Sequence, residues 1–119
     1  MPILTIDAVL DPKQPLPAGV ASRIADAAAE VLGTASASTW VLIRPIPAAN
    51  YAENGVDQAP APLLVSLRQR QPPEAEQRAQ QVLDLTRALA RACEREMNQI
   101  HILYELPAAG RQAFGGQLV

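Results

Sequence analysis

The segment PILTIDAV at residues 2–9 decides the fold, because its opening returns later in the chain. The tripeptide Pro-Ile-Leu at Pro2 is matched by Pro-Leu-Leu at Pro62, a spacing of 60 positions. The same spacing relates Pro-Ala-Ala at Pro47 to Pro-Ala-Ala at Pro107. Two matches at one spacing indicate an internal repeat of a strand–helix–strand unit.

The chain has 119 residues, a usual length for one domain. We therefore predict a single domain over residues 1–119, built from pseudo-repeats 2–58 and 62–119. Hydrophobic residues make up 49% and charged residues 18% of the chain, which favours a folded core over disorder. Its net charge of −2 excludes a broad cationic surface for nucleic acids or anionic membranes.

Hydrophobic periodicity predicts two helices between the strands. Val20, Ile24, Ala27 and Val31 share one face of a helix from Pro17 to Leu32. In the second repeat, Pro72 and Pro73 open a longer helix that continues to Met97. Segments rich in β-formers predict four strands, at residues 2–9, 39–46, 62–70 and 99–106.

These elements predict an α/β fold of the two-layer α+β type, with a tandem βαβ repeat. The sheet has four strands in mixed orientation, and both helices cover one face because parallel crossovers are right-handed. The other face is then bare, although the strands carry apolar residues at consecutive positions, as in Val41-Leu42-Ile43. We therefore expect another copy of the chain to cover this face.

A single cysteine and a single histidine exclude a disulfide framework and a zinc site within one chain, so no metal is expected. Cys93 is interpreted as a small buried hydrophobic residue and His101 as an ordinary sheet residue. The N-terminus lacks the basic lead of a secretory signal, and no apolar run reaches membrane-spanning length. These features favour a cytoplasmic protein that does not bind membranes.

Pro2 is the first candidate for chemistry. Methionine before proline is normally removed, which would turn the Pro2 nitrogen from an amide into a secondary amine. A free α-amino group titrates at about pH 7.7–8.0 in peptides, and nearby cations lower that pKa. The amine could then act as a neutral base near pH 7. A proline at position 2 is by itself a weak signal.

The doubled strand–helix–strand unit that begins at Pro2 resembles the tautomerase superfamily over essentially the whole chain. The resemblance implies that Pro2 is the catalytic base or acid and that the reaction needs no cofactor. It also implies a homotrimer whose sheets surround a central axis. The overall layout resembles the macrophage migration inhibitory factor type, which has two units per chain.

Two arginines point to one group within this superfamily. Arg68-Gln69-Arg70, at the end of the third predicted strand, resembles a segment of the malonate semialdehyde decarboxylase group. This implies that Arg68 and Arg70 are catalytic and bind a small carboxylate substrate. Guanidinium groups bind carboxylates with two hydrogen bonds, and alternate strand positions point to one side. The alternative interpretation is two solvated arginines at a strand end.

Three further residues are substrate-binding candidates by position. Tyr51 matches an aromatic pocket residue of 4-oxalocrotonate tautomerases, and Trp40 stands where those enzymes have a binding arginine. Ser38 stands where decarboxylase members have an aspartate. For Trp40 and Tyr51 the alternative is simple packing, and Phe114 is expected to pack at a subunit junction.

The resulting hypothesis is an enol–keto tautomerase acting on a small 2-oxo or 2-hydroxyalkenoic acid. A first alternative is a decarboxylase or hydratase of a three-carbon oxo acid in the same superfamily. A second is a non-catalytic trimer that binds a small acid or a protein partner.

Overall fold

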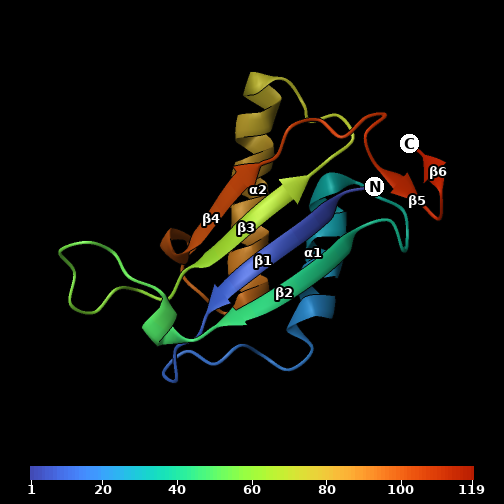
Figure 1. The fold of residues 1–119 in the computed structure, drawn as a ribbon. Helices are drawn as coiled ribbons and strands as arrows, with labels where there is room; N and C mark the ends of the chain where they lie inside the picture. Colours follow the sequence, from blue (N-terminus) through green and yellow to red (C-terminus); the bar gives the residue numbers. More distant parts are fainter.

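The computed structural model describes all 119 residues. Two strand–helix–strand units follow one another, and short elements lie in the connections and in the C-terminal segment (Figure 1). The principal elements are β1 (Ile3–Val9), α1 (Val20–Leu32), β2 (Trp40–Ile46), β3 (Leu63–Arg68), α2 (Ala75–Cys93) and β4 (Ile100–Tyr104). The short ones are η1 (Ala48–Asn50), η2 (Met97–Gln99), β5 (Ala113–Phe114) and β6 (Gln117–Leu118).

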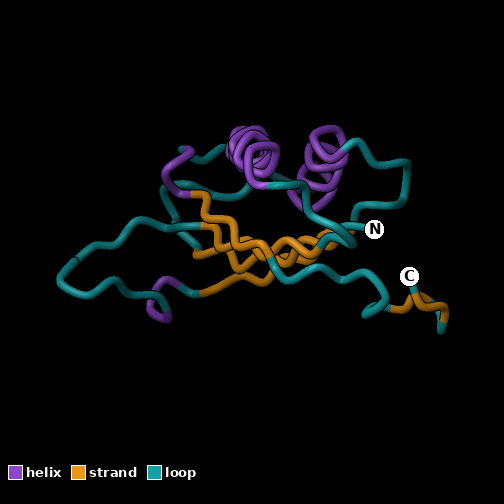
Figure 2. The backbone as a smooth tube through the Cα atoms, turned by 90° about the horizontal axis from the view of Figure 1, so that it is seen from above, coloured by secondary structure: helices purple, strands orange, loops and turns teal.

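The sheet has the strand order β2-β1-β3-β4. Strands β1 and β2 are parallel, as are β3 and β4, whereas β1 and β3 are antiparallel. Both helices lie on the same face of this sheet (Figure 2). The predicted two-layer α+β fold with a four-stranded mixed sheet is therefore confirmed. No helix combines the length and apolar character needed to cross a membrane.

The core lies between the sheet and the two helices and is aliphatic. Leu4 and Ile6 of β1 are fully buried and meet Leu85 and Leu89 of α2 within one cluster that also includes Ile24 of α1. Because core packing resembles a crystal in density, these contacts fix the sheet against both helices. The rigid sheet in turn fixes the position of both ends of β1.

Both helices are shorter than their periodicity predicts. α1 begins at Val20 rather than Pro17, because Gly19 is left-handed (φ 68°) and breaks the helical backbone before it. α2 ends at Cys93 rather than Met97, because Glu94 is left-handed (φ 54°). The next residue, Arg95, donates from its backbone N–H to the Ala90 carbonyl, a closing pattern that ends many helices.

Arg95 explains why α2 stops. Its side chain is buried and donates to the Ala61 carbonyl at 2.6 Å and to the Gln14 carbonyl at 3.0 Å. These two bonds tie the β1–α1 connection to the segment before β3. A helix continuing to Met97 would leave both carbonyls without this donor, so the tertiary contacts override the helical pattern.

The sheet register relates the two units by 61 positions rather than 60. Helix-facing residues of β1 have even numbers, such as Leu4 and Ile6, whereas those of β3 have odd numbers, such as Val65. With an even spacing, a residue on the helix-covered face in one unit would correspond to a residue on the open face in the other unit. The helix ends agree, because Gly33 and Glu94, 61 positions apart, are both left-handed C-caps.

The open face of the sheet carries an ion pair in each unit. Arg44 Nε donates to Asp7 at 2.8 Å, and Arg68 Nε donates to Glu105 at 2.7 Å. Under the spacing of 61, Asp7 corresponds to Arg68 and Arg44 to Glu105, so the charges are reversed between the units. Apolar residues also remain uncovered on this face, with Leu42 54% and Leu103 66% exposed.

Candidate active site

Pro2 is buried directly before the first strand. Its carbonyl accepts the Trp40 backbone N–H at 3.0 Å, which fixes Pro2 against the start of β2. Met1 precedes it and is 37% exposed, and while Met1 is attached the Pro2 nitrogen is an amide without a proton. Any chemistry at this nitrogen therefore requires removal of Met1.

The two predicted arginines differ in their surroundings. Arg68 is the last residue of β3, lies opposite Ile3 and is held by Glu105. Arg70 lies beyond the strand, which ends two residues earlier than predicted, and makes no ion pair. Its backbone carbonyl accepts the Ala109 N–H at 3.0 Å. The structure thus brings both arginines to the Pro2 end of the sheet, but only Arg68 is in the ladder.

Trp40 and Ser38 also lie at this end. Trp40 is the first residue of β2, opposite Ile3, and is 41% exposed. Its indole N–H donates to the Ala37 carbonyl at 3.0 Å, and its ring meets Phe114 edge-on at 4.9 Å. Phe114 therefore packs against Trp40 of its own chain, and its expected place at a subunit junction stays a prediction. Ser38 lies two residues before β2 in the same turn.

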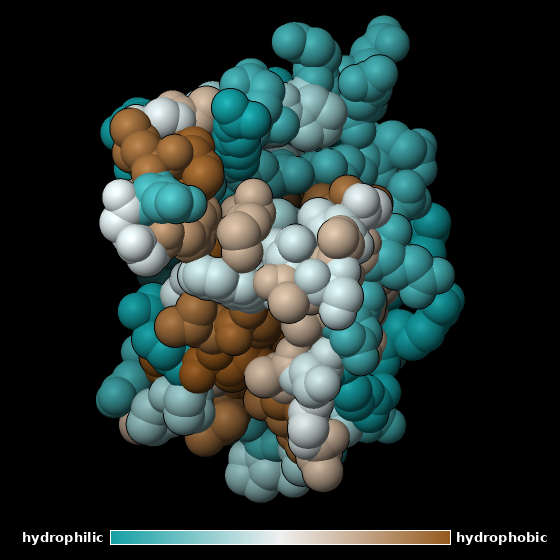
Figure 3. All heavy atoms as spheres, turned by 90° about the vertical axis from the view of Figure 1, so that its right-hand side faces the viewer, coloured by the Kyte–Doolittle hydropathy of each residue, from teal (hydrophilic) through white to brown (hydrophobic).

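The surface around this end of the sheet is partly hydrophobic. Figure 3 shows hydrophobic atoms gathered into patches on the side of the molecule that carries the N-terminus and the β5–β6 hairpin. Exposed hydrophobic residues at this end include Met1, Trp40 and Leu118. These apolar side chains lie at the same end of the sheet as Arg68 and Arg70.

Tyr51 is not brought to Pro2. It follows η1 and lines a cavity of about 460 Å³ together with Val9 and Leu10, at the opposite end of β1. The seven residues of β1 separate the two ends by roughly 20 Å. The Tyr51 hydroxyl donates to Glu53 at 2.6 Å, and this hydrogen bond raises the pKa of Tyr51. Within one chain, Tyr51 and Pro2 therefore cannot share a small substrate.

Two residues that the sequence patterns did not single out lie near Arg68. Arg111 and Gln112 line a cavity of about 580 Å³ beside Arg68 and Glu105. Both side-chain amide atoms of Gln112 are buried without a hydrogen-bond partner. No motif marks these residues, because they lie in the irregular segment after β4, and only the folded chain brings them to Arg68.

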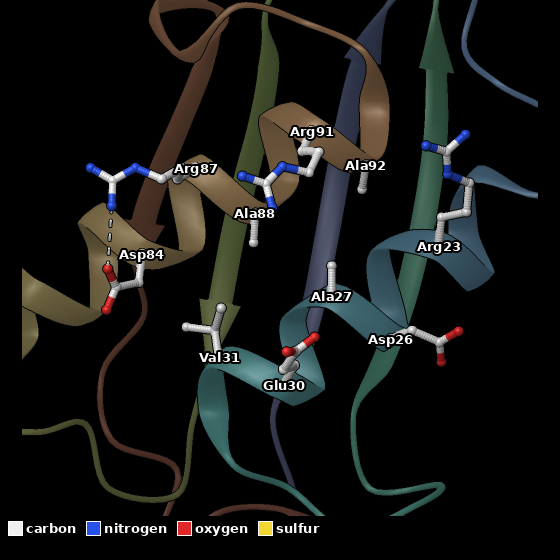
Figure 4. Close-up of a pocket in the computed structure, with 10 residues that line it drawn as sticks. All are labelled: Arg23, Asp26, Ala27, Glu30, Val31, Asp84, Arg87, Ala88, Arg91 and Ala92. Atoms are coloured by element: carbon white, nitrogen blue, oxygen red, sulfur yellow. Dashed lines mark ion pairs between the residues drawn. The ribbon is translucent and has the colours of Figure 1, made fainter.

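A larger cavity, of about 760 Å³, lies away from Pro2 between α1 and α2 (Figure 4). Its floor is made of small residues such as Ala27 and Ala88. The six charged residues around it are Arg23, Asp26, Glu30, Asp84, Arg87 and Arg91. Three positive and three negative side chains balance one another. None of the predicted site residues lies here, so this groove is not the candidate site.

The remaining reactive residues lie outside the site. Cys93 is fully buried, and desolvation raises the pKa of its thiol to about 11, so it is a neutral packing residue near pH 7. His101 is an exposed residue of β4, opposite Leu64. No group of three His, Cys, Asp or Glu side chains is arranged to hold a metal ion.

No protein-family model matches the chain, and no curated protein sequence matches it. Several solved structures do match the chain. The Q0 fused 4-OT wild-type symmetric trimer matches with a TM-score of 0.73 and 16% identity, over 98% of this chain and 94% of that chain. Macrophage migration inhibitory factor from Oncomelania hupensis matches with a TM-score of 0.74 and 16% identity, over 99% of this chain and 82% of that chain.

A third match is malonate semialdehyde decarboxylase, described with decarboxylase and hydratase activities, with a TM-score of 0.69 and 16% identity, over 95% of this chain and 90% of that chain. The three matches have TM-scores of 0.69 to 0.74 over nearly the whole of this chain, which shows a common fold. These three are tautomerase-superfamily structures, and the chain has their fold. The resemblance inferred from the Pro2-led repeat is confirmed at the level of the fold.

Proposed function

We propose that the chain, after removal of Met1, is a cofactor-independent tautomerase that converts the enol of a small 2-oxo acid into its keto form. The observation that carries the proposal is the place of Pro2. It is fixed by the Trp40 N–H at the end of the sheet where Arg68 and Arg70 also lie, in a fold shared with fused 4-OT.

The space that Met1 leaves defines where substrate would react. Continuing the β1–β3 register from the Ile3–Arg68 pair places Met1 opposite Arg70. Continuing the β1–β2 register places Met1 beside Ser38. The freed Pro2 nitrogen would face this space, because its new N–H bonds replace the bond to Met1. Arg70, which has no carboxylate partner, would then face the reacting end of the substrate and stabilise negative charge there.

The reaction needs one base with two roles. The Pro2 nitrogen takes the proton of the enol hydroxyl, and the carbonyl double bond forms as the C=C electrons move to carbon 3. The resulting Pro2 ammonium returns a proton to that carbon, so the atoms balance without a co-reactant. Arg68 and Arg70 stabilise the negative charge that develops on the substrate oxygen. Trp40 and Ser38 form the side wall.

We propose that the active assembly is a homotrimer. The uncovered Leu42 and Leu103 on the open sheet face favour a covering subunit. Tyr51, roughly 20 Å from Pro2 in its own chain, could reach a substrate only at a neighbouring subunit's Pro2. The matching Q0 fused 4-OT is a symmetric trimer, which supports the same assembly here.

The first test is the state of the N-terminus and its effect on activity. Intact mass should show loss of Met1, and processed protein should ketonise the enol of phenylpyruvate. Pro2→Ala should lower kcat/KM by about 10²-fold, the usual range for losing a positioned base. Pro15→Ala, in an exposed loop away from the site, is the control. Full activity of Pro2→Ala, or of protein that keeps Met1, would exclude the mechanism.

Decarboxylation or hydration of a three-carbon oxo acid is the alternative that the geometry also supports. Glu105, 2.7 Å from Arg68, is a carboxylate near the site that could hold a water molecule. The match to malonate semialdehyde decarboxylase favours the same chemistry. Processed protein should be tested against phenylpyruvate enol, 2-hydroxymuconate and malonate semialdehyde. Turnover of malonate semialdehyde alone would replace the tautomerase assignment, and inactivity on all three would favour a non-catalytic binding protein.

A further inference from the structure

The cavity beside Arg68 combines a free guanidinium group with an amide that has no partner. We infer that it is a carboxylate-binding subsite, in which Arg111 and Gln112 hold the acid group of a small organic acid. This inference rests on the proposed function, because the acid it names is the substrate or product of the reaction at Pro2.

The segment that carries these residues is fixed to the end of β3. The Glu105 N–H donates to the Leu67 carbonyl at 2.9 Å, and the Ala108 N–H donates to the Gln69 carbonyl at 3.0 Å. The Arg111 N–H then turns back to the Ala108 carbonyl at 2.8 Å. These backbone hydrogen bonds fasten the irregular segment that lines the cavity to the end of β3.

The charges around the cavity favour an anion. Arg68 uses its Nε to bind Glu105, whereas Arg111 forms no ion pair. The cavity thus has two guanidinium groups and one carboxylate, a net positive charge. Since guanidinium groups bind carboxylates with paired hydrogen bonds, Arg111 is the available partner for an incoming acid.

Gln112 supplies the second observation. Its Nε2 and Oε1 atoms are both buried without a partner, although buried amides are nearly always hydrogen-bonded. Both atoms are closed off from solvent in this conformation, so Nε2 would donate to an acid group in the cavity once the Gln112 side chain rotates toward it. The remaining wall includes Leu106, Pro107 and Ala108, which suits an apolar body attached to the acid.

The test measures binding rather than turnover. Processed protein is titrated with 3-phenylpropanoate, an acid with an apolar body and no keto group, and the dissociation constant is obtained by calorimetry. Arg111→Met should weaken binding by about tenfold, as expected for loss of a charged hydrogen-bond partner. Arg87→Met removes the same charge on α2, outside the site, and should leave the dissociation constant unchanged.

Gln112→Leu separates a ligand-binding role from a structural one. Because it removes two buried atoms without partners, it should raise the melting temperature while weakening the binding of 3-phenylpropanoate. Unchanged binding in Arg111→Met, equal weakening in Arg87→Met, or a Gln112→Leu variant that binds normally would overturn the inference. If processed protein binds the acid but converts no enol, the proposed tautomerase fails while the subsite stands.

Discussion

Replacing Glu105 by glutamine should strengthen the binding of small carboxylates, because it weakens the hold on Arg68 and removes a negative charge near the subsite. The pair is half-exposed, with side-chain exposures of 46% for Arg68 and 34% for Glu105, so water screens it in part. For a ligand acid about 6 Å from Glu105, at an effective dielectric constant of about 40–80, the lost repulsion is about 0.7–1.4 kcal/mol. This corresponds to a dissociation constant about three- to tenfold lower.

The assay is calorimetric titration of processed protein with 3-phenylpropanoate at low and high salt. The gain in affinity should shrink as salt rises, because exposed charges are screened. Glu30→Gln, which changes net charge equally in the groove between the helices, is the matched control. Equal affinity of Glu105→Gln and the wild type at low salt would refute the reasoning, as would an equal gain in Glu30→Gln.

Three further predictions concern stability. Leu89→Ala should lower the free energy of unfolding by about 2–5 kcal/mol in urea denaturation, because Leu89 is fully buried, while Leu83→Ala, at an exposed position, should change it little. The Cys93 pKa of about 11 lies above its ordinary value of 9.0, so the unfolded chain loses the thiol proton first. The free energy of unfolding should therefore fall as pH rises from 9 to 11, by at most about 2.7 kcal/mol. Denaturation curves of the wild type and Cys93→Val should diverge in this pH range. Parallel curves would contradict the raised pKa of Cys93. Glu94→Gly should raise the melting temperature, because glycine removes a left-handed strain of about 1 kcal/mol; a decrease would show that the Arg23–Glu94 contact at 3.9 Å matters more.

The element order and the two-layer fold could be predicted from the sequence because the repeat and the periodicity reflect burial directly. The ends of the helices could not be predicted as well. The apolar stripe of α2 continues past Cys93, yet the chain turns at Glu94 because Arg95 must reach the carbonyls of Gln14 and Ala61. Such long-range contacts leave no periodic pattern in the sequence.

The spacing of the repeat shows a similar limit. Matching letters relate Pro2 to Pro62, but the sheet faces and helix caps require a spacing of 61, which makes Leu63 the counterpart of Pro2. Small residues and prolines recur by composition, whereas the side of a strand depends on whether a spacing is odd or even. The pairing of the strands in the structure is what shows which face of the sheet each residue occupies.

The candidate site was predicted in part. Pro2, Arg68 and Arg70 gather at one end of the sheet, as their sequence positions suggest, although the strand ends at Arg68. Tyr51 lies at the other end, because it follows the strand that runs parallel to β1 and so leaves the sheet where β1 also ends. Arg111 and Gln112 belong to an irregular segment, and nothing short of the fold places them beside Arg68.

Corresponding charged positions in the two units carry opposite charges, and this gives the molecule a dipole moment across the approximate two-fold axis between the units. A pair of identical units related by a two-fold axis has no dipole moment perpendicular to that axis. In the helix layer, Arg23 and Arg91 lie at one end of the groove, and Glu30 and Asp84 lie toward the other. On the open face, the outer charges are Arg44 on β2 and Glu105 beyond β4. The two layers thus carry dipoles in different directions, which would orient the chain as it approaches charged molecules or other copies of itself.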